Sequence, residues 1–186
     1  NALRNLGVEC ANGKWIAFLD DDDVWLKNKI ELQVKCFETK DIDLCYTGKT
    51  IVNKNGQKIK YSYHKAKFNS DTKSIMWDNF IGTTSSVMID KNILLAVNKF
   101  DEKLPALQDY DLYIRICKKY KVTGIDRPLI KYLNNHSINQ ISKNKNHFQQ
   151  ACKLLELKYK TWPHSSMLII SLSKLKIKRK FKEFYE

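Results

Sequence analysis

The sequence predicts an α/β domain with a mixed sheet flanked by helices, and three patterns carry this prediction. Segments of strand and helix character alternate along most of the 186 residues. A short apolar run, Trp15 to Leu19, lies between Gly13 and four consecutive aspartates, as expected of a buried strand. The dipeptide Asn55-Gly56 stands between two strand-like segments, which is a strong hairpin signal and requires one antiparallel pair.

The first half of the chain alternates helix and strand. Residues 2–11 predict a helix that stops before Gly13. After the 15–19 strand, residues 26–39 predict an amphipathic helix whose apolar face consists of Leu26, Ile30, Val34 and Phe37. The two hairpin strands are predicted at 44–52 and 58–63.

The second half continues the alternation. Further strands are predicted at 85–89, 122–125 and 129–133. Helices are predicted at 71–79, at 109–120 with Leu112, Ile116 and Tyr113 inward, and from 146 onward with a break at Pro163.

Charge divides the chain unevenly. Residues 143–186 contribute +8 of the net charge of +13. We therefore expect two parts, a domain over 1–142 and a basic helical extension over 143–186 that favours an anionic partner. Basic residues alternate with apolar ones over 165–186, which is typical of a helix lying on an anionic membrane, although a helix packed on its own domain explains the pattern equally well.

The cysteines and the apolar stretches exclude some classes of protein. The five cysteines include no CxxC pair, so reduced thiols in a cytosolic protein are expected. The apolar stretches are shorter than the roughly 18 residues that a membrane-spanning helix needs.

The four aspartates, Asp20 to Asp23, follow the predicted strand directly. Clustered carboxylates at a strand end repel each other, and a divalent cation such as Mg²⁺ or Mn²⁺ would relieve that repulsion. The carboxyl end of a strand in an α/β sheet is also a common ligand site. The alternative is a solvated acidic turn or a helix N-terminus that favours negative charge.

Three ordered segments resemble glycosyltransferase family 2, whose fold is GT-A. The string ALRNLGVECANGKWIAFLDDDDVWLKNKIELQ resembles the first block of that family, LQDYDLYIRI its E-D-x-D segment, and YLNNHSINQIS its Y-R-x-H segment. The resemblance covers residues 2–142. It implies a metal-dependent, inverting transfer of a hexose or an N-acetylhexosamine from a nucleotide-diphosphate donor to a glycan or lipid-linked acceptor, with Mn²⁺ or Mg²⁺ as cofactor.

The resemblance implies a role for each matching residue. The donor would be bound by Arg4, Asn5, Asp20, Asp22 and Asp23. The metal ligands would be Asp22, Asp20 and His136, while Asp21 stands at a variable position. The base would be Asp109 with Asp111 as fallback, and the donor sugar or acceptor would meet Gly82, Thr83, Thr84 and Gln108. In this sequence Gln108 replaces the acid of the family pattern and can donate a hydrogen bond but cannot act as a base.

The resemblance also bears on completeness and location. The family opens with a strand–helix–strand unit that binds the nucleotide base, and a unit of that kind needs about thirty residues or more. No such unit precedes Asn1, so we expect a partial GT-A domain that by itself can be inactive. The resemblance implies sugar addition to a bacterial cell-surface glycan such as lipopolysaccharide or capsule, and the basic tail would hold the enzyme on the cytoplasmic face of the inner membrane.

Two alternatives stay open at this point. Asp20, Asp22 and Val24 also fit the D-x-D-x-T/V motif of haloacid-dehalogenase-like phosphatases, in which Asp20 would be the nucleophile. A non-enzymatic basic module would bind nucleic acid through the tail, but the sequence contains no recognised nucleic-acid motif, so no nucleic-acid partner is expected.

Overall fold

The computed structural model describes residues 1–53, 55–62, 71–133 and 144–185, with side chains described as far as residue 178. The helices are α1 (Ala2–Cys10), α2 (Lys29–Thr39), α3 (Thr72–Trp77), α4 (Lys91–Ala96), α5 (Gln108–Cys117), α6 (Lys145–Lys158) and α7 (Ser165–Tyr185), with a short 3₁₀ turn η1 (Thr84–Ser86). The strands are β1 (Trp15–Ala17), β2 (Asp23–Trp25), β3 (Leu44–Val52), β4 (Lys58–Ser62), β5 (Val87–Asp90) and β6 (Val122–Leu133).

These strands form one mixed sheet in the order β1-β5-β3-β6-β2, with β4 paired to β3. The β3–β6 pair is parallel and the other pairs are antiparallel. The α/β prediction and the hairpin at Asn55-Gly56 are confirmed. The two strands predicted at 122–125 and 129–133 form one continuous strand, β6.

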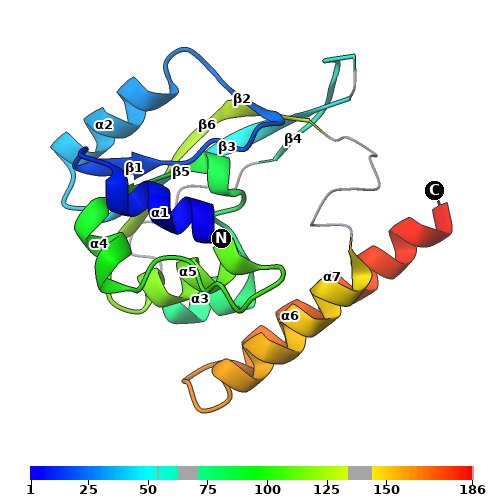
Figure 1. Ribbon diagram of the computed structural model, residues 1–186. Coiled ribbons are helices and arrows are strands. Elements are labelled where there is room, and N and C mark those ends of the chain that lie inside the picture. Colours follow the sequence, from blue (N-terminus) through cyan, green and yellow to red (C-terminus); the bar gives the residue numbers. More distant parts are fainter. Residues whose placement is uncertain (54, 63–70, 134–143, 186) are drawn as a thin grey trace.

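Helices cover both faces of the sheet (Figure 1). The side chains of β3 alternate, so that Leu44 and Tyr46 face the main core while Cys45 faces α2. Gly124 of β6 lies opposite Tyr46, and a Cβ there would come within 2.6 Å of the tyrosine ring, so glycine is required.

The inner face predicted for α2 is wrong. The buried residues of this helix are Lys29, Gln33 and Cys36, whereas Ile30 is 38% exposed. The prediction followed apolar periodicity, but the interior that α2 covers is lined by backbone carbonyls that a polar side chain satisfies.

The C-terminal helices are not detached from the domain. Phe148, Cys152 and Leu155 of α6 belong to the same buried cluster as the sheet and α5, and so does Tyr159 at the C-cap of that helix. Figure 1 shows α6 and α7 side by side along the body, with the far end of α7 extending away from it. The division at residue 142 stays a prediction, but packing joins α6 to the rest of the chain.

Candidate active site

The acidic run does not lie at the end of one strand but in the connection between two. Strand β1 ends at Ala17, and Asp23 already begins β2, a short strand that sequence reasoning missed. The backbone N–H of Asp23 donates to the carbonyl of Asp20 over 3.1 Å and closes a turn. The N–H of Asp20 donates to Ser85 Oγ over 3.0 Å, so the run is attached to η1.

The first acid of the run is paired with α1. Asp20 accepts an ion-paired hydrogen bond from Arg4. The Arg4 guanidinium also lies 5.7 Å from the centroid of the Phe100 ring. Two residues predicted at the donor site therefore meet, and the arginine neutralises one of the clustered charges.

The last acid of the run lies in the interior. Asp23 is 6% exposed, and neither of its carboxylate oxygens has a hydrogen-bond partner among the described residues. Burial raises the pKa of Asp23 to about 6, and the charges of Asp22 and Asp20 add to the rise. Lys49 opposes that rise, as does the nearby Ser85 hydroxyl, which makes no hydrogen bond of good geometry to it.

The acid of the second motif is influenced by charges of the first. Asp109 lies in the first turn of α5, which begins after Leu107 in the left-handed conformation (φ 58°). Burial raises the pKa of Asp109, Asp20 adds to the rise, and Arg4 and Lys49 oppose it. These mutual effects place the two predicted motifs, distant in sequence, within electrostatic reach of each other.

Sequence reasoning missed three residues of this region. The Lys49 ammonium of β3 lies 4.2 Å from the ring centroid of Tyr132 on β6, and its charge acts on both Asp23 and Asp109. The buried Tyr113 hydroxyl has no hydrogen-bond partner among the described residues. A lysine in the middle of an otherwise uncharged strand was the available signal. We call Asp20, Asp22, Asp23, Lys49 and Asp109 the acidic site.

Asp111, the predicted fallback base, is part of a different arrangement. Its side chain is 0% exposed and forms ion pairs with Arg115 at 2.7 Å and Lys158 at 2.8 Å. The Tyr159 hydroxyl donates to Asp111 Oδ1 over 2.7 Å. Lys158 also pairs with Asp101 at 2.6 Å. We call these five residues the Asp111 network, and its geometry favours a structural role for Asp111.

The other predicted residues have varied positions. The buried Asn5 amide donates to Phe100 O over 2.9 Å and to Glu102 Oε1 over 2.8 Å, which engages it within the protein. Gln108 donates to Leu104 O over 3.2 Å.

The predicted loop before β5 lies against the acidic run through its 3₁₀ turn. Gly82 has φ 94°, which favours glycine, and Thr84 is buried while Thr83 is half-buried. His136, the predicted third metal ligand, lies outside the described residues.

The donor set fits a hard cation that shares its ligands with a substrate. In the described part of the chain, no group of three His, Cys, Asp or Glu side chains is arranged to hold a metal by itself. Mg²⁺ and similar ions are commonly held by one or two carboxylates together with substrate phosphates and water. The unpartnered oxygens of Asp23 beside Asp20 and Asp22 are acceptors suited to such an ion.

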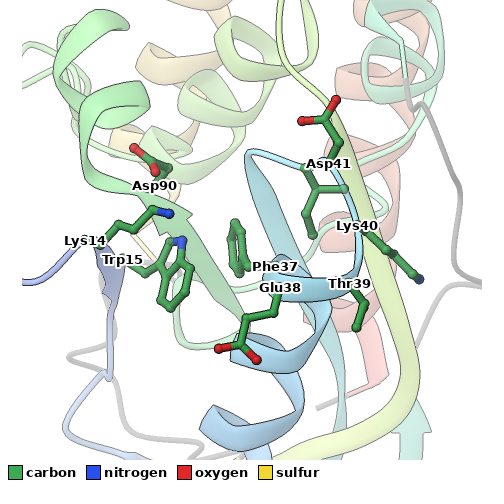
Figure 2. A pocket seen from close by; sticks show the side chains of 9 residues that line it. Lys14, Trp15, Phe37, Glu38, Thr39, Lys40, Asp41 and Asp90 are labelled. Atoms are coloured by element: carbon green, nitrogen blue, oxygen red, sulfur yellow. The ribbon is translucent and has the colours of Figure 1, made fainter.

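A surface hollow lies outside the acidic site. It has a volume of about 420 Å³ and contains no predicted site residue. Figure 2 shows its lining, in which Lys14 and Trp15 face Phe37 and the segment that follows α2. A second hollow of about 360 Å³ follows α1 and β1 and includes Arg4.

Known proteins resemble this chain in sequence. The model of glycosyltransferase-like family 2 matches residues 1–160. An uncharacterized glycosyltransferase of Methanocaldococcus jannaschii is 34% identical over 166 residues, which are 88% of this chain and 57% of the relative. The Escherichia coli UDP-Glc:α-D-GlcNAc-diphosphoundecaprenol β-1,3-glucosyltransferase WfgD is 31% identical over 76% of this chain and 53% of its own length. The chain thus spans about half the length of these two relatives.

Solved structures show the same fold. Staphylococcus aureus TarS residues 1–349, in complex with UDP-GlcNAc, superimposes with a TM-score of 0.68 at 13% identity, over 89% of this chain and 49% of that TarS chain. Its complex with UDP gives a TM-score of 0.55. The mixed sheet with flanking helices is therefore GT-A-like, as the sequence predicted.

Proposed function

The chain belongs to glycosyltransferase family 2, and from this premise we propose that the protein transfers a hexose or an N-acetylhexosamine from a nucleotide-diphosphate donor to a hydroxyl of a glycan or lipid-linked acceptor. The single observation that carries the proposal is the family match over residues 1–160, which spans both the acidic run and Asp109. The UDP-GlcNAc and UDP complexes of TarS support a nucleotide donor. The diphosphoundecaprenol acceptor in the name of WfgD supports a lipid-linked acceptor.

Asp109 is the proposed general base. An acceptor hydroxyl becomes a competent nucleophile when a base takes its proton as the new bond forms. The raised pKa of Asp109 makes the carboxylate a better proton acceptor than an ordinary surface aspartate. One base acting opposite the leaving group fits a single displacement, which inverts the anomeric centre.

Asp22 and Asp20, with Asp23 beside them, are the residues that would hold Mn²⁺ or Mg²⁺. When bound, such an ion neutralises the charge that develops on the departing diphosphate. Arg4 holds Asp20 and carries a positive charge on the same side, which suits a donor phosphate. His136 is proposed as an additional ligand.

The sugar-facing side of the proposed site consists of Gly82, Thr83, Thr84 and Gln108. The Gly82–Thr84 segment leads directly into η1, to which the acidic run is attached through Ser85. Hydroxyl and amide groups suit hydrogen bonding to a sugar. Asn5 supports this region indirectly, since its amide holds the Phe100 backbone beneath Arg4.

Turnover of a panel of nucleotide sugars by the full-length protein tests this function. With Mn²⁺ present, one donor should be turned over well above the others. Asp22→Asn should reduce the rate and the Mn²⁺ affinity together, whereas Asp21→Asn, at the variable position, should change neither by more than a few-fold. Equal turnover by wild type and Asp22→Asn would contradict the site.

We further propose that the basic extension holds the enzyme at the cytoplasmic face of the inner membrane, where lipopolysaccharide or capsule precursors are built. Among the described residues no helix is long and apolar enough to cross a bilayer. On α7, Ile170 and Ile177 are exposed at helical spacing, and the Lys174 ammonium lies 4.0 Å from the Trp77 ring centroid. Apolar and basic groups that lie together in this way suit an anionic interface.

Sedimentation with liposomes tests the location. Vesicles containing anionic lipid should bind the protein at low salt and release it at high salt. Removal of residues 174–186 should abolish that binding. Binding that is unchanged by this removal would contradict the proposal.

The two alternatives drawn from the sequence are not retained. The family match spans the D-x-D segment, the E-D-like segment and α6 together, which a haloacid-dehalogenase-like phosphatase does not explain. A basic nucleic-acid module explains none of these segments.

A further inference from the structure

A buried lysine stands on the inner face of α2. Lys29 is 0% exposed. Its ammonium donates to Gln33 Oε1 over 2.6 Å and lies 4.3 Å from the centroid of the Trp25 ring. No carboxylate lies within ion-pair distance of Lys29 in the described ranges. Burial lowers its pKa to about 8.

Such a lysine is a poor choice for stability alone. An ammonium loses hydration when it is buried, and one amide oxygen with one aromatic face restores only part of it. Apolar residues of similar volume commonly match or exceed buried charges in stability. The lysine therefore calls for an explanation other than packing.

The contact with Gln33 sets the direction of an amide. Because an ammonium only donates, Gln33 must present its oxygen to Lys29. Its nitrogen then donates to Cys45 O over 2.9 Å and to Ser86 O over 3.1 Å. The same side chain thus connects α2, the central strand β3 and η1.

The contact with Trp25 leads to the acidic run. Trp25 Nε1 donates to Ser85 O over 3.0 Å, and Ser85 Oγ accepts from the backbone N–H of Asp20 over 3.0 Å. Ser85 therefore holds both ends of the segment from Asp20 to Trp25. Lys29 contacts this segment at Trp25, and through Gln33 it fixes Ser86, the neighbour of Ser85.

We propose that Lys29 is a positioning residue for the acidic site, acting through Gln33 and Trp25 to hold η1 against the segment 20–25. The consequence for turnover rests on the proposed function, whereas the positioning itself can be measured without it. The polar inner face of α2 then has a purpose that apolar residues could not serve, since a donor at position 29 satisfies the Gln33 oxygen while the Gln33 nitrogen donates to two carbonyls.

The variant Lys29→Met tests the proposal, because methionine keeps the length and removes the donor. Its Tm should be at least that of the wild type, since a buried charge is removed. In ¹H–¹⁵N spectra, the Trp25 indole resonance, identified by Trp25→Phe, and the backbone amides of Asp20 to Asp23 should shift. In the full-length enzyme, kcat/KM should fall roughly 10- to 100-fold, as for partners that orient metal ligands. Lys35→Met, at an exposed position of the same helix, should change none of these.

Two results would overturn the proposal. One is Lys29→Met with unchanged Asp20–Asp23 amides and full turnover. The other is a fall in Tm with shifts spread evenly over the sheet, which indicates packing alone. If Lys29→Met does not fold, Gln33→Glu decides, because glutamate still accepts from Lys29 but cannot donate to the two carbonyls. It should shift the same amides, and unshifted amides would refute the positioning. If the wild type transfers no sugar, the proposed function fails while the spectra still decide on Lys29.

Discussion

The acidic site and the Asp111 network both contain buried carboxylates. They differ in how far those carboxylates are paired with other groups. Asp111 is completely enclosed, and each of its oxygens meets a cation or a hydroxyl. Asp23 is nearly as enclosed, and its oxygens have no hydrogen-bond partner in the described residues. Asp109, two residues from Asp111 on the same helix, has a pKa raised by burial.

The difference distinguishes a carboxylate that stabilises the fold from one that is left available to a ligand. A carboxylate whose charge is matched inside the protein fixes the fold but is not available to a ligand. A carboxylate that is left without partners destabilises the free protein and gains when a cation or a proton arrives. Perturbed groups of the second kind cluster at functional sites. The helix α5 thus carries, within a single turn, Asp111 with its charge matched and Asp109, which accepts from the backbone N–H of Tyr110 over 2.8 Å and has a pKa raised by burial.

The largest effect is expected at Asp109. In the full-length enzyme Asp109→Asn should lower the rate of sugar transfer by roughly 10²- to 10⁴-fold, since the amide cannot take a proton. The free energy of unfolding should not fall at pH 7, because the raised pKa shows that the fold disfavours the charged form. Single-turnover kinetics and urea unfolding measure the two quantities. Full activity in Asp109→Asn would show that Asp109 is not the general base.

At Asp111 we expect a loss of folding stability. Asp111→Asn should lower the free energy of unfolding by about 3–5 kcal/mol, because two cations then face an uncharged amide in the interior. The matched control is Asp101→Asn, which removes a partly exposed partner of Lys158 and should cost less than about 1 kcal/mol. Urea unfolding of both variants measures the contrast. Equal losses would show that burial of Asp111 does not decide its role.

Asp23 should behave as a destabilising residue whose effect depends on pH. Its pKa of about 6 in the fold exceeds the ordinary 3.8, so the fold favours the protonated form. The destabilisation is absent below about pH 4, grows as the pH rises toward 6 and is complete above it. Asp23→Asn should therefore unfold with up to about 3 kcal/mol more free energy at pH 7 and gain less than about 1 kcal/mol at pH 4. Thermal unfolding from pH 4 to pH 7.5 checks this, and a constant difference over that range would contradict it.

The smallest effect compares two tyrosines. Tyr159→Phe removes the hydroxyl that donates to Asp111 and should cost about 1–2 kcal/mol. Tyr113→Phe, near the acidic site, removes a buried hydroxyl without a hydrogen-bond partner and should cost nothing or stabilise slightly. Urea unfolding of the two variants under the same conditions measures both losses of free energy. A larger loss for Tyr113→Phe than for Tyr159→Phe would contradict the prediction.

Local patterns predicted most of the fold. The β3–β4 hairpin followed from Asn55-Gly56, and α5 from its apolar spacing, with Leu112, Tyr113 and Ile116 inward. The strand β2 was missed because three residues beginning with an aspartate carry no strand signal of their own. It forms because its partner β6 provides the register, Asp23 opposite Tyr132.

Residues of the candidate site that belong to a sequence motif could be predicted. Residues that come together only through the fold could not. The acidic run and Asp109 stood out in the sequence, and in the fold the charge of Asp20 adds to the raised pKa of Asp109; their shared site stays a prediction. Lys49 was visible as the one charge in an otherwise uncharged strand, but its relation to Asp23 could not be predicted, because it depends on the parallel pairing of β3 with β6. Asp111 was predicted as the fallback base after Asp109, since its partners Lys158 and Tyr159 are distant in sequence and gave no sign of its network.

The separation in sequence between Asp111 and its partners also affects the order in which parts of the newly made chain can pack. Asp111 and Tyr159 are 48 residues apart, so the ribosome adds the second partner only after the first has been made. At the usual speed of synthesis, roughly 5–20 residues per second, the interval is roughly 2–10 s. During that interval the interior beside α5 contains an acid whose partners on α6 do not yet exist. The docking of α6 on α5 therefore cannot begin until residue 158 and its neighbour Tyr159 have been made.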